Sequence, residues 1–294
     1  LQDALASRAS QFRLQVVPAW PHLGLYLFIM TDISQPYHPS PSAGRPDDRH
    51  ADTTDFGFRD VPLRQKKSLV RDVFDSVASK YDIMNDVMSL GIHRAWKRIF
   101  VNELAPHPDL SLLDLAGGTG DISFGWLRGG GGPAILSDIN VSMLTVGRNR
   151  ALDRGLVSGL NFLAVDAEAI PLADNSVDRV SIAFGLRNCT DKLQVLREAR
   201  RILRPGGRFL CLEFSRVQVA AFAPVYDAWS FHVLPRMGAA IAGDRESYQY
   251  LAESIRMFPD QETLADMMRE AGLERVSYQN LSGGIAAIHS GWRI

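Results

Sequence analysis

A chain of 294 residues is long enough for one large domain, or for one domain with appendages. Its 46% hydrophobic and 22% charged residues are typical of a globular protein. A formal net charge of -1 leaves no basic excess to replace phosphate counterions, so we expect no nucleic-acid partner. Two cysteines, Cys189 and Cys211, cannot form a disulfide framework or a paired metal-ligand motif, and we expect no metal site.

The first part of the chain differs from the rest in composition. Two prolines interrupt the apolar stretch Leu14–Met30, which favours neither a membrane span nor a signal peptide. Residues 31–53 are rich in Pro, Ser, Asp and Gly and are expected to be disordered. Met30 is a candidate for the natural start. We therefore interpret residues 1–53 as a disordered or non-native extension and residues 54–294 as the folded domain.

Hydrophobic periodicity predicts the elements of that domain. Helical spacing covers residues 62–105, and from residue 110 short apolar runs alternate with amphipathic ones. The predicted strands are Leu112–Leu115, Ala134–Leu136, Leu160–Val165, Val177–Ala183, Arg208–Phe214, Arg275–Asn280 and Ile285–His289. The predicted helices are Ile122–Leu127, Ser142–Arg154, Lys192–Leu203 and Gln261–Ala271. The alternation indicates an α/β, Rossmann-like, mostly parallel seven-stranded sheet that ends in an antiparallel hairpin.

The segment Leu112–Asp121, LLDLAGGTGD, joins the first buried strand of this sheet to a helix through a glycine turn. Gly117, Gly118 and Gly120 let a ligand approach backbone N–H groups with no Cβ in the way. A glycine turn alone is a weak signal. The residues downstream therefore decide which cofactor the turn serves.

Acidic residues at the ends of the next two strands indicate that cofactor. Asp138 stands 20 positions after Gly118, where a carboxylate can accept both hydroxyls of a ribose. Asp166 can accept from an adenine amino group, and Ala167 leaves room for the ring. The alternative for each carboxylate is a solvated strand end or a helix N-cap. Asp114 lies inside the strand and is expected to support the glycine turn or to balance cofactor charge.

These residues favour S-adenosylmethionine over a dinucleotide. A dinucleotide site has the pattern G-x-G-x-x-G, which brings the pyrophosphate to the helix N-terminus. Here Ser123 occupies the position of the third glycine, and S-adenosylmethionine has no phosphate that would require it. The predicted terminal hairpin also disfavours the alternative, an NAD(P) oxidoreductase.

A series of spaced sequence blocks extends this interpretation from Thr54 to the C-terminus. The blocks are TDFGFRDV, YDIMN (Tyr81–Asn85) followed by Ser89, His93 and Trp96, then DLAGGTGDIS, SDINVSML, FGLRN, RILRPGGRFLCLEFS, YDAWSFHVLPR and SYQYLAESIRMFPDQETL. In this order they resemble the ubiquinone/menaquinone biosynthesis C-methyltransferase family, which includes 2-methoxy-6-polyprenyl-1,4-benzoquinol methylases and demethylmenaquinone methyltransferases.

The resemblance implies that the substrate is a polyprenylated benzoquinol, a demethylmenaquinol, or both, and that the methyl group goes to a ring carbon. It also implies that Gly117, Thr119, Asp138, Asp166 and Ala167 bind the cofactor. The family usually has Ser before Phe-Gly in the next block, where this chain has Ala183. One hydroxyl contact with the cofactor would then be missing, a loss of about 1 kcal/mol.

Methylation of a ring carbon needs precise positioning, a proton acceptor and a group that stabilises an oxyanion. Arg187 and Asn188 follow the fourth predicted strand, at the carboxyl edge of the sheet where ligands bind. We expect Arg187 to lower the phenol pKa through its charge and Asn188 to orient the hydroxyl. Because arginine stays protonated, Arg187 is not expected to be the base itself.

The proton acceptor has four candidates, namely Tyr81, Asp82, His93 and His232. Each histidine has the alternative of a structural, hydrogen-bonded residue. Tyr81 is also expected to close over the cofactor. The predicted catalytic set is therefore Arg187, Asn188 and Tyr81.

Residues 224–259 form an insert whose aromatic and aliphatic side chains either line a channel for an isoprenoid tail or pack as a lid. Such a tail implies peripheral membrane contact or association with a quinone-biosynthesis complex. The sequence is compatible with a homodimer. It favours a cytoplasmic protein peripheral to the inner membrane, with the matrix face of the mitochondrial inner membrane as the alternative.

Two other functions stay open. A methyltransferase that acts on O or N of another small molecule is disfavoured by the complete Tyr81–Trp96 signature. A non-catalytic subunit of a quinone-biosynthesis complex is disfavoured by the intact Thr119, Asp138 and Arg187, although Ala183 mildly supports it.

Overall fold

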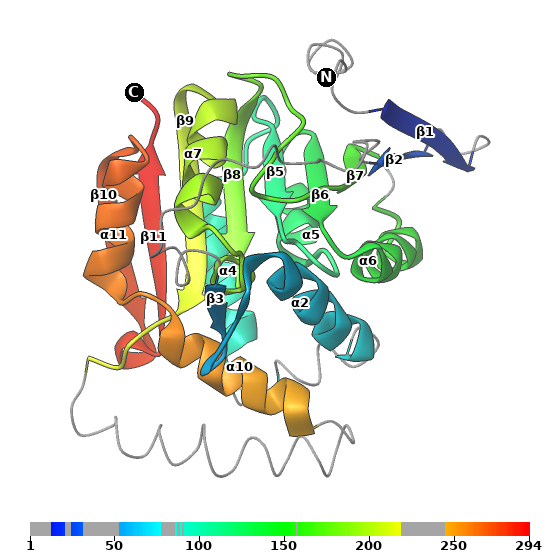
Figure 1. Cartoon of the computed structure of the whole chain (residues 1–294). Coiled ribbons are helices and arrows are strands. Elements are labelled where there is room, and N and C mark those ends of the chain that lie inside the picture. The colour runs from blue at the N-terminus through cyan, green and yellow to red at the C-terminus, as the bar shows by residue number, and fades with distance from the viewer. Residues whose placement is uncertain are drawn as a thin grey trace, which may run out of the picture.

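The computed structural model describes residues 13–20, 25–31, 53–77, 86, 89, 91–156, 158–218 and 245–294. The strands of its main sheet are β1 (Arg13–Trp20), β2 (Leu25–Thr31), β5 (Leu112–Leu115), β6 (Ala134–Asp138), β7 (Leu160–Ala164), β8 (Val177–Ala183), β9 (Leu203–Phe214), β10 (Glu274–Leu281) and β11 (Ala286–Trp292). They lie in the order β1-β2-β7-β6-β5-β8-β9-β11-β10 (Figure 1). Strands β5 to β9 run parallel, and β11 pairs antiparallel with both β9 and β10.

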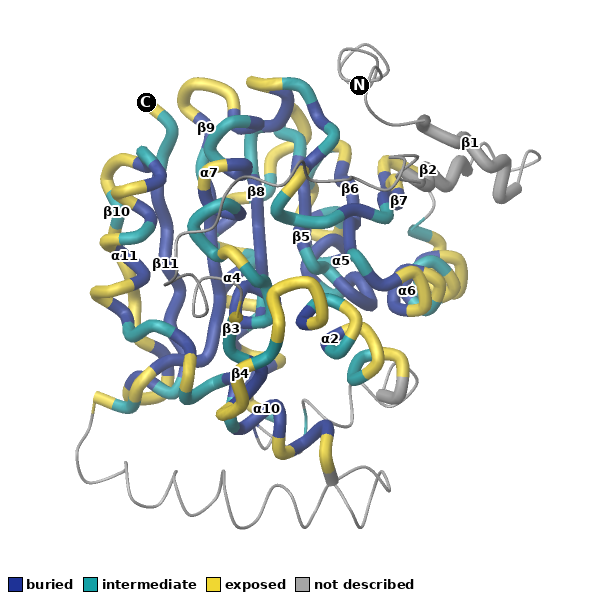
Figure 2. The backbone as a smooth tube through the Cα atoms, in the orientation of Figure 1, coloured by how far each residue is buried: buried dark blue, intermediate teal, exposed yellow. Residues whose placement is uncertain are grey.

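Helices cover both faces of the sheet. On one face lie α4 (His93–Leu104), α5 (Asp121–Arg128) and α6 (Val141–Asp153), and on the other lie α7 (Lys192–Ile202) and α11 (Gln261–Glu270) (Figure 1). Each face has its own apolar core: Phe100, Trp126 and Leu144 belong to one, and Leu196 and Leu264 to the other. The central strands are therefore buried along their length (Figure 2).

A third unit lies at the end of the sheet where β5 to β8 have their carboxyl ends. It consists of the hairpin β3 (Thr53–Phe56) and β4 (Arg59–Pro62), helix α2 (Leu63–Val77) and helix α10 (Arg245–Met257) (Figure 1). A small apolar cluster holds the unit together, with Phe56, Val70 and Tyr250 at its centre. Segments that are far apart in the sequence thus meet over the carboxyl ends of the strands, where the sequence predicts a ligand.

The seven strands β5 to β11 confirm the predicted fold class, including the C-terminal hairpin, whose turn is η6 (Ser282–Gly284). Two predicted strands, Leu112–Leu115 and Val177–Ala183, have the observed bounds. Strand β9 begins at Leu203, five residues before the predicted start, because Val177 already pairs with Leu203 before the register shifts. Proline and glycine in this stretch therefore bend a strand and do not only end a helix.

The structure also contains strands that the sequence analysis does not predict. The short polar hairpin β3–β4 lies at the start of the folded domain, and β1 and β2 lie in the first 53 residues. β2 pairs in parallel with β7 and so extends the seven-stranded sheet by two strands. Apolar runs of this length are compatible with strands, although periodicity alone does not separate them from other buried segments. The rest of the first 53 residues lies outside the described residues.

Candidate active site

The strand order brings the predicted site residues together at the carboxyl ends of neighbouring strands. Asp166 follows β7, Asp138 ends β6, the glycine turn follows β5, and Ala183 ends β8. These strands are neighbours in the sheet, although they are far apart in the chain. Loops at the carboxyl ends of parallel strands are where α/β proteins bind ligands.

The glycine turn depends on close packing beneath it as well as on access from above. A Cβ at Gly117 would lie 2.4 Å from Leu136 Cδ1 and 2.8 Å from Asp114 Oδ2. Gly118 has a left-handed φ of +55°, which a residue with a side chain adopts only with strain. Helix α6 also packs tightly against the turn, since a Cβ at Gly147 would lie 3.1 Å from Gly118 O. Because its glycines have no side chains, the turn can pack closely against the sheet and still offer its backbone to a ligand.

Asp114 supports this turn from inside the protein. Its Oδ2 accepts hydrogen bonds from Ser123 N (3.1 Å) and Ser123 Oγ (2.8 Å), and its Oδ1 accepts one from Ser181 Oγ (2.7 Å). Burial raises the pKa of Asp114 to about 6, against the lowering effect of these hydrogen bonds. Ser123, which replaces the third glycine of a dinucleotide motif, is therefore part of the support for the turn. Asp114 supports the turn, as expected.

Asp138 faces the turn from the end of β6. Its Oδ2 accepts a hydrogen bond from Gly118 N (2.9 Å), and its Oδ1 accepts one from Asn140 N (2.8 Å). Burial raises the pKa of Asp138 to about 6, although both backbone donors lower it. Each carboxylate oxygen has two acceptor positions, so both oxygens can still accept from a ligand. The carboxylate is thus fixed in direction before any ligand binds. In the turn itself, Thr119, which follows Gly118, is buried.

Asp166 has a partner that the sequence analysis does not predict. Lys67 on α2 donates to Asp166 Oδ2 at 2.5 Å and also pairs with Glu168 at 2.8 Å. Asp166 Oδ1 accepts from Glu168 N at 3.0 Å, across Ala167. These two carboxylates raise the pKa of Lys67, although its burial lowers it. Helix α2 is therefore tied directly to the segment predicted to contact adenine.

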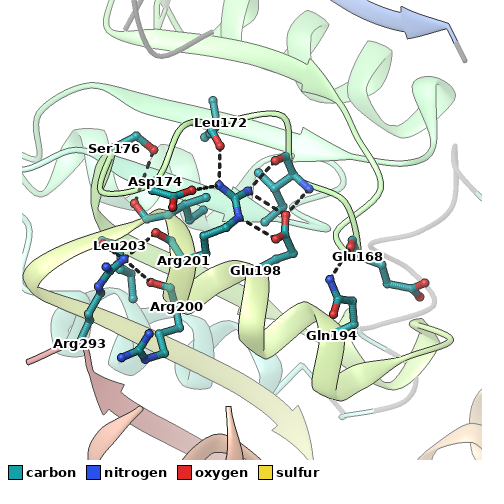
Figure 3. Close-up of polar contacts among 12 residues, drawn as sticks. Glu168, Leu172, Asp174, Ser176, Gln194, Glu198, Arg200, Arg201, Leu203 and Arg293 are labelled. Atoms are coloured by element: carbon teal, nitrogen blue, oxygen red, sulfur yellow. Dashed lines mark hydrogen bonds and ion pairs between the residues drawn. The ribbon is translucent and has the colours of Figure 1, made fainter. Parts of the chain in front are cut away.

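The segment after Asp166 is held from the opposite side by helix α7 (Figure 3). Arg201 donates to the carbonyls of Ile170 and Leu172 (both 2.8 Å) and to both carboxylate oxygens of Glu198 (2.7 and 2.8 Å). Glu198 in turn accepts from Ile170 N at 2.8 Å. Near the start of the same helix, Gln194 donates to the carbonyl of Glu168, as Figure 3 also shows. Arg201 thus fixes the path of the loop that carries Asp166 and Ala167.

Arg187 lies in η4 (Leu186–Asn188), directly after β8, and forms a buried ion pair. Its Nη1 donates to Glu213 Oε1 at 2.8 Å and also to the carbonyl of Phe184. Both members of the pair have side chains that are only 1% exposed. Its guanidinium also lies over the ring of Phe214, 5.7 Å from the centroid. Glu213 is the second-last residue of β9 and is not among the predicted site residues.

Asn188 also has a partner that the sequence analysis did not find. The hydroxyl of Tyr250 on α10 donates to Asn188 Oδ1 at 3.1 Å. Tyr250 lies within the block SYQYLAESIRMFPDQETL, which carries part of the family resemblance. The spacing of 62 positions between the two residues carries no local signal that could have linked them.

Of the four candidate bases, His93 is the one within the described residues. Its ring Nδ1 is 2.8 Å from Ser89 Oγ, and the backbone N–H of His93 donates to the same oxygen. Burial lowers the pKa of His93 to about 4, so the imidazole is neutral at neutral pH. These contacts are those of a structural histidine at a helix start. Tyr81, Asp82 and His232 lie outside the described residues.

The order β7-β6-β5-β8-β9-β11-β10, with a glycine turn after β5 and an acidic residue after β6, defines the class: an S-adenosylmethionine-dependent methyltransferase of class I. Solved structures share this fold. A methyltransferase of this class from Thermotoga maritima superimposes with a TM-score of 0.56 at 19% identity, over 76% of this chain and 99% of that one. Another from Methanococcus maripaludis gives a TM-score of 0.51 at 16% identity, over 74% and 91%.

Within that class, the chain belongs to the ubiE/COQ5 methyltransferase family, whose sequence profile matches residues 61–293. It is similar to the ubiquinone/menaquinone biosynthesis C-methyltransferase UbiE of Acidiphilium cryptum, with 68% identity over 247 residues, 84% of this chain and 99% of that protein. The protein of the same name from Bradyrhizobium diazoefficiens is 55% identical over 252 residues, 84% of this chain and 100% of that protein.

The described residues fit S-adenosylmethionine. Asp138 presents a carboxylate that two backbone N–H groups hold in place, and the neighbouring turn has a bare backbone in the left-handed conformation at Gly118. Ser123, at the position of the third glycine of a dinucleotide motif, instead donates a hydrogen bond to Asp114. These features match a nucleoside ligand without phosphate.

We predict that Arg201→Met lowers the free energy of unfolding by about 2–4 kcal/mol, because it leaves Glu198 and two carbonyls without their charged donor. Amide hydrogen exchange should show the largest loss of protection at Ile170, whose N–H bonds to Glu198. Arg197→Met is the matched control, since Arg197 pairs with Glu270 on the surface and should change stability little. Equal destabilisation by the two substitutions would contradict the role of Arg201.

Proposed function

We propose that this chain transfers a methyl group to a ring carbon of a polyprenylated benzoquinol, a demethylmenaquinol, or both, in ubiquinone and menaquinone biosynthesis. The proposal rests on the 68% identity with a protein named as a C-methyltransferase of these pathways, which this chain covers almost completely. The site supports it, since a nucleoside cradle lies beside a buried arginine and an asparagine amide.

The cofactor residues have separate parts in this proposal. Asp138 accepts the ribose hydroxyls, and Gly117 and Thr119 belong to the turn along the methionine part of the cofactor. Asp166 accepts from the adenine amino group while it retains Lys67, and Ala167 and Ala183 leave room for the ring and ribose. When bound, the cofactor supplies an electrophilic methyl group.

Arg187 and Asn188 act on the acceptor. A ring carbon becomes nucleophilic when a neighbouring hydroxyl loses its proton, because phenolate charge then spreads onto the ring. The charge of Arg187 favours that ionised form, and the amide of Asn188 can donate to the oxygen. Glu213 holds the guanidinium in place and offsets the cost of burying its charge. Tyr81 closes over the cofactor, and the base is one of Tyr81, Asp82 and His232, since His93 has the contacts of a structural histidine.

The reaction itself tests the function. Purified chain incubated with S-adenosylmethionine and a short-chain prenyl quinol should yield a product heavier by one methyl group, with the added carbon on the ring by mass spectrometry and NMR. Product methylated on oxygen would favour the O-methyltransferase alternative. Cofactor binding without any methylated quinol would favour the non-catalytic subunit.

Asp138→Asn should weaken S-adenosylmethionine binding about 10- to 100-fold, because an amide replaces a charged acceptor. The pKa of Asp138 is raised to about 6, so the carboxylate takes up a proton as the pH falls through that value. Affinity of the wild-type chain, measured by calorimetry, should therefore weaken below about pH 6, and the variant should lose most of this dependence. Asp153→Asn, at an exposed position on α6, is the control. Unchanged affinity in Asp138→Asn would remove the ribose role.

We further propose that the chain works at a membrane surface, since a polyprenyl tail is retained by the bilayer. The described residues include no helix long and apolar enough to cross a membrane. Exposed apolar side chains lie on the unit that covers the site, with Phe58 58%, Leu63 41% and Met257 49% exposed. The cytoplasmic face of the inner membrane is the proposed location, with the mitochondrial matrix face as the alternative.

Flotation with vesicles of phosphatidylethanolamine and phosphatidylglycerol tests the membrane contact. The wild-type chain should float with the vesicles, and Phe58→Asp should do so less, because it places a charge where an apolar ring would enter the interface. Ile99→Asp, also at an exposed apolar position but on α4, is the control. A wild-type chain that stays in the unbound fraction would contradict the proposal.

A further inference from the structure

Tyr250 lies at the site without any role in the scheme above. It projects from α10, its side chain is buried, and its ring stacks on Phe56 with centroids 4.2 Å apart and planes at 21°. Its hydroxyl donates to Asn188 Oδ1 at 3.1 Å. Stacking on β3 fixes the ring, so the position of the hydroxyl is fixed by packing and not by the hydrogen bond alone.

The hydroxyl of Tyr250 is a donor and not a base. Burial raises its pKa above the ordinary value, and the nearby Asp55, Cys189 and Glu213 act in the same direction. The charge of Arg187 is the second-largest effect and lowers the pKa, but burial outweighs it. The hydroxyl therefore keeps its proton at neutral pH.

A hydrogen bond donated by this hydroxyl to Asn188 Oδ1 favours one orientation of the Asn188 amide over the reverse one, in which the hydroxyl would have to accept. The two ends of an asparagine amide are nearly equal in shape, so only their partners distinguish them. With Oδ1 turned to Tyr250, the NH2 group points to the other side. Among the described residues Nδ2 has no hydrogen-bond partner, and neither does the buried Nε of Arg187. Two N–H groups of adjacent residues in η4 thus have no acceptor among the described residues.

We propose that Tyr250 is a positioning residue, which holds the Asn188 amide so that its NH2 group donates to the oxygen of the substrate ring. This inference rests on the proposed function, because the oxygen is that of the quinol. Without the hydroxyl the amide can turn its carbonyl toward a developing phenolate, and that orientation repels the charge. Tyr250 therefore affects the acceptor step through Asn188, and it leaves cofactor binding unchanged.

Tyr250→Phe tests this, because it keeps the ring stacked on Phe56 and removes only the hydroxyl. We expect kcat for the quinol to fall about three- to tenfold, the effect of one net hydrogen bond, while the Kd of S-adenosylmethionine by calorimetry stays at the wild-type value. Tyr278→Phe is the matched control. The Tyr278 hydroxyl bonds to Glu262 on the surface, away from η4, and its loss should leave kcat unchanged.

A double-mutant cycle shows whether Tyr250 acts through Asn188. In an Asn188→Ala background, Tyr250→Phe should cause no further loss of kcat, because the amide that it orients is absent. Asn188→Asp should be less active than Asn188→Ala, since the carboxylate still accepts from Tyr250 but offers the substrate no donor. Thermal unfolding of every variant separates these effects from loss of fold.

The outcomes distinguish this inference from the function on which it rests. If the wild-type chain neither binds nor methylates the quinol, both proposals fail. If the wild-type chain is active and Tyr250→Phe has the same kcat, only the role of Tyr250 fails. An equal loss of kcat in the wild-type and Asn188→Ala backgrounds, or a weaker affinity for S-adenosylmethionine, would also overturn it, because the hydroxyl would then support the fold or the cofactor.

Discussion

The buried carboxylate of Asp114 is the interaction on which the rest of the site depends. It accepts hydrogen bonds from Ser123 on α5 and Ser181 on β8, so one side chain joins the central strand to the helix after the glycine turn and to the next strand. A carboxylate buried without such donors would cost several kcal/mol. Because a Cβ at Gly117 would meet this carboxylate, the same packing requires a glycine there. The turn that faces the cofactor is therefore set by contacts beneath it.

The other polar groups of the site lie at the carboxyl ends of the strands on either side of β5. Asp138 on one side is held by backbone donors of the turn and of Asn140, and Arg187 on the other side is held by Glu213. Each side chain is oriented by the protein itself before a ligand arrives. Such preorganisation allows a site to stabilise charge that develops during a reaction without first reorganising its own groups.

The unit formed by the β3–β4 hairpin, α2 and α10 lies over the site. Ionic and aromatic contacts between distant segments hold it there. Lys67 on α2 binds Asp166, Asp75 of the same helix accepts from Asn140, and Phe56 stacks on Tyr250. Helix α2, the β3–β4 hairpin and α10 are therefore fastened to the loops of the cofactor edge at several points. This arrangement places apolar side chains on the outside of this unit, close to the site in which a quinol ring would react.

Much of this protein can be predicted from the sequence alone. Short, largely apolar runs such as Leu112–Leu115 predict buried parallel strands, and this one has the observed bounds and is buried along its whole length. The glycine turn, Ser123 and Asp138 lie within one strand–helix–strand unit, and their spacing indicates a nucleoside cofactor without phosphate. Short, mostly polar strands such as β3 carry no such pattern, because Phe56 at the end of this strand is its one buried residue.

Only the tertiary structure determines the partners of these residues. Glu213 lies 26 positions from Arg187, Tyr250 lies 62 from Asn188, and Lys67 lies 99 from Asp166. Periodicity reports which face of an element is buried, whereas strand order and helix packing decide which side chains meet. The sequence by itself therefore determined the fold class, the cofactor turn and the residues that follow each strand. The fold decided which donors orient them, because those contacts form only when distant elements pack at one edge of the sheet.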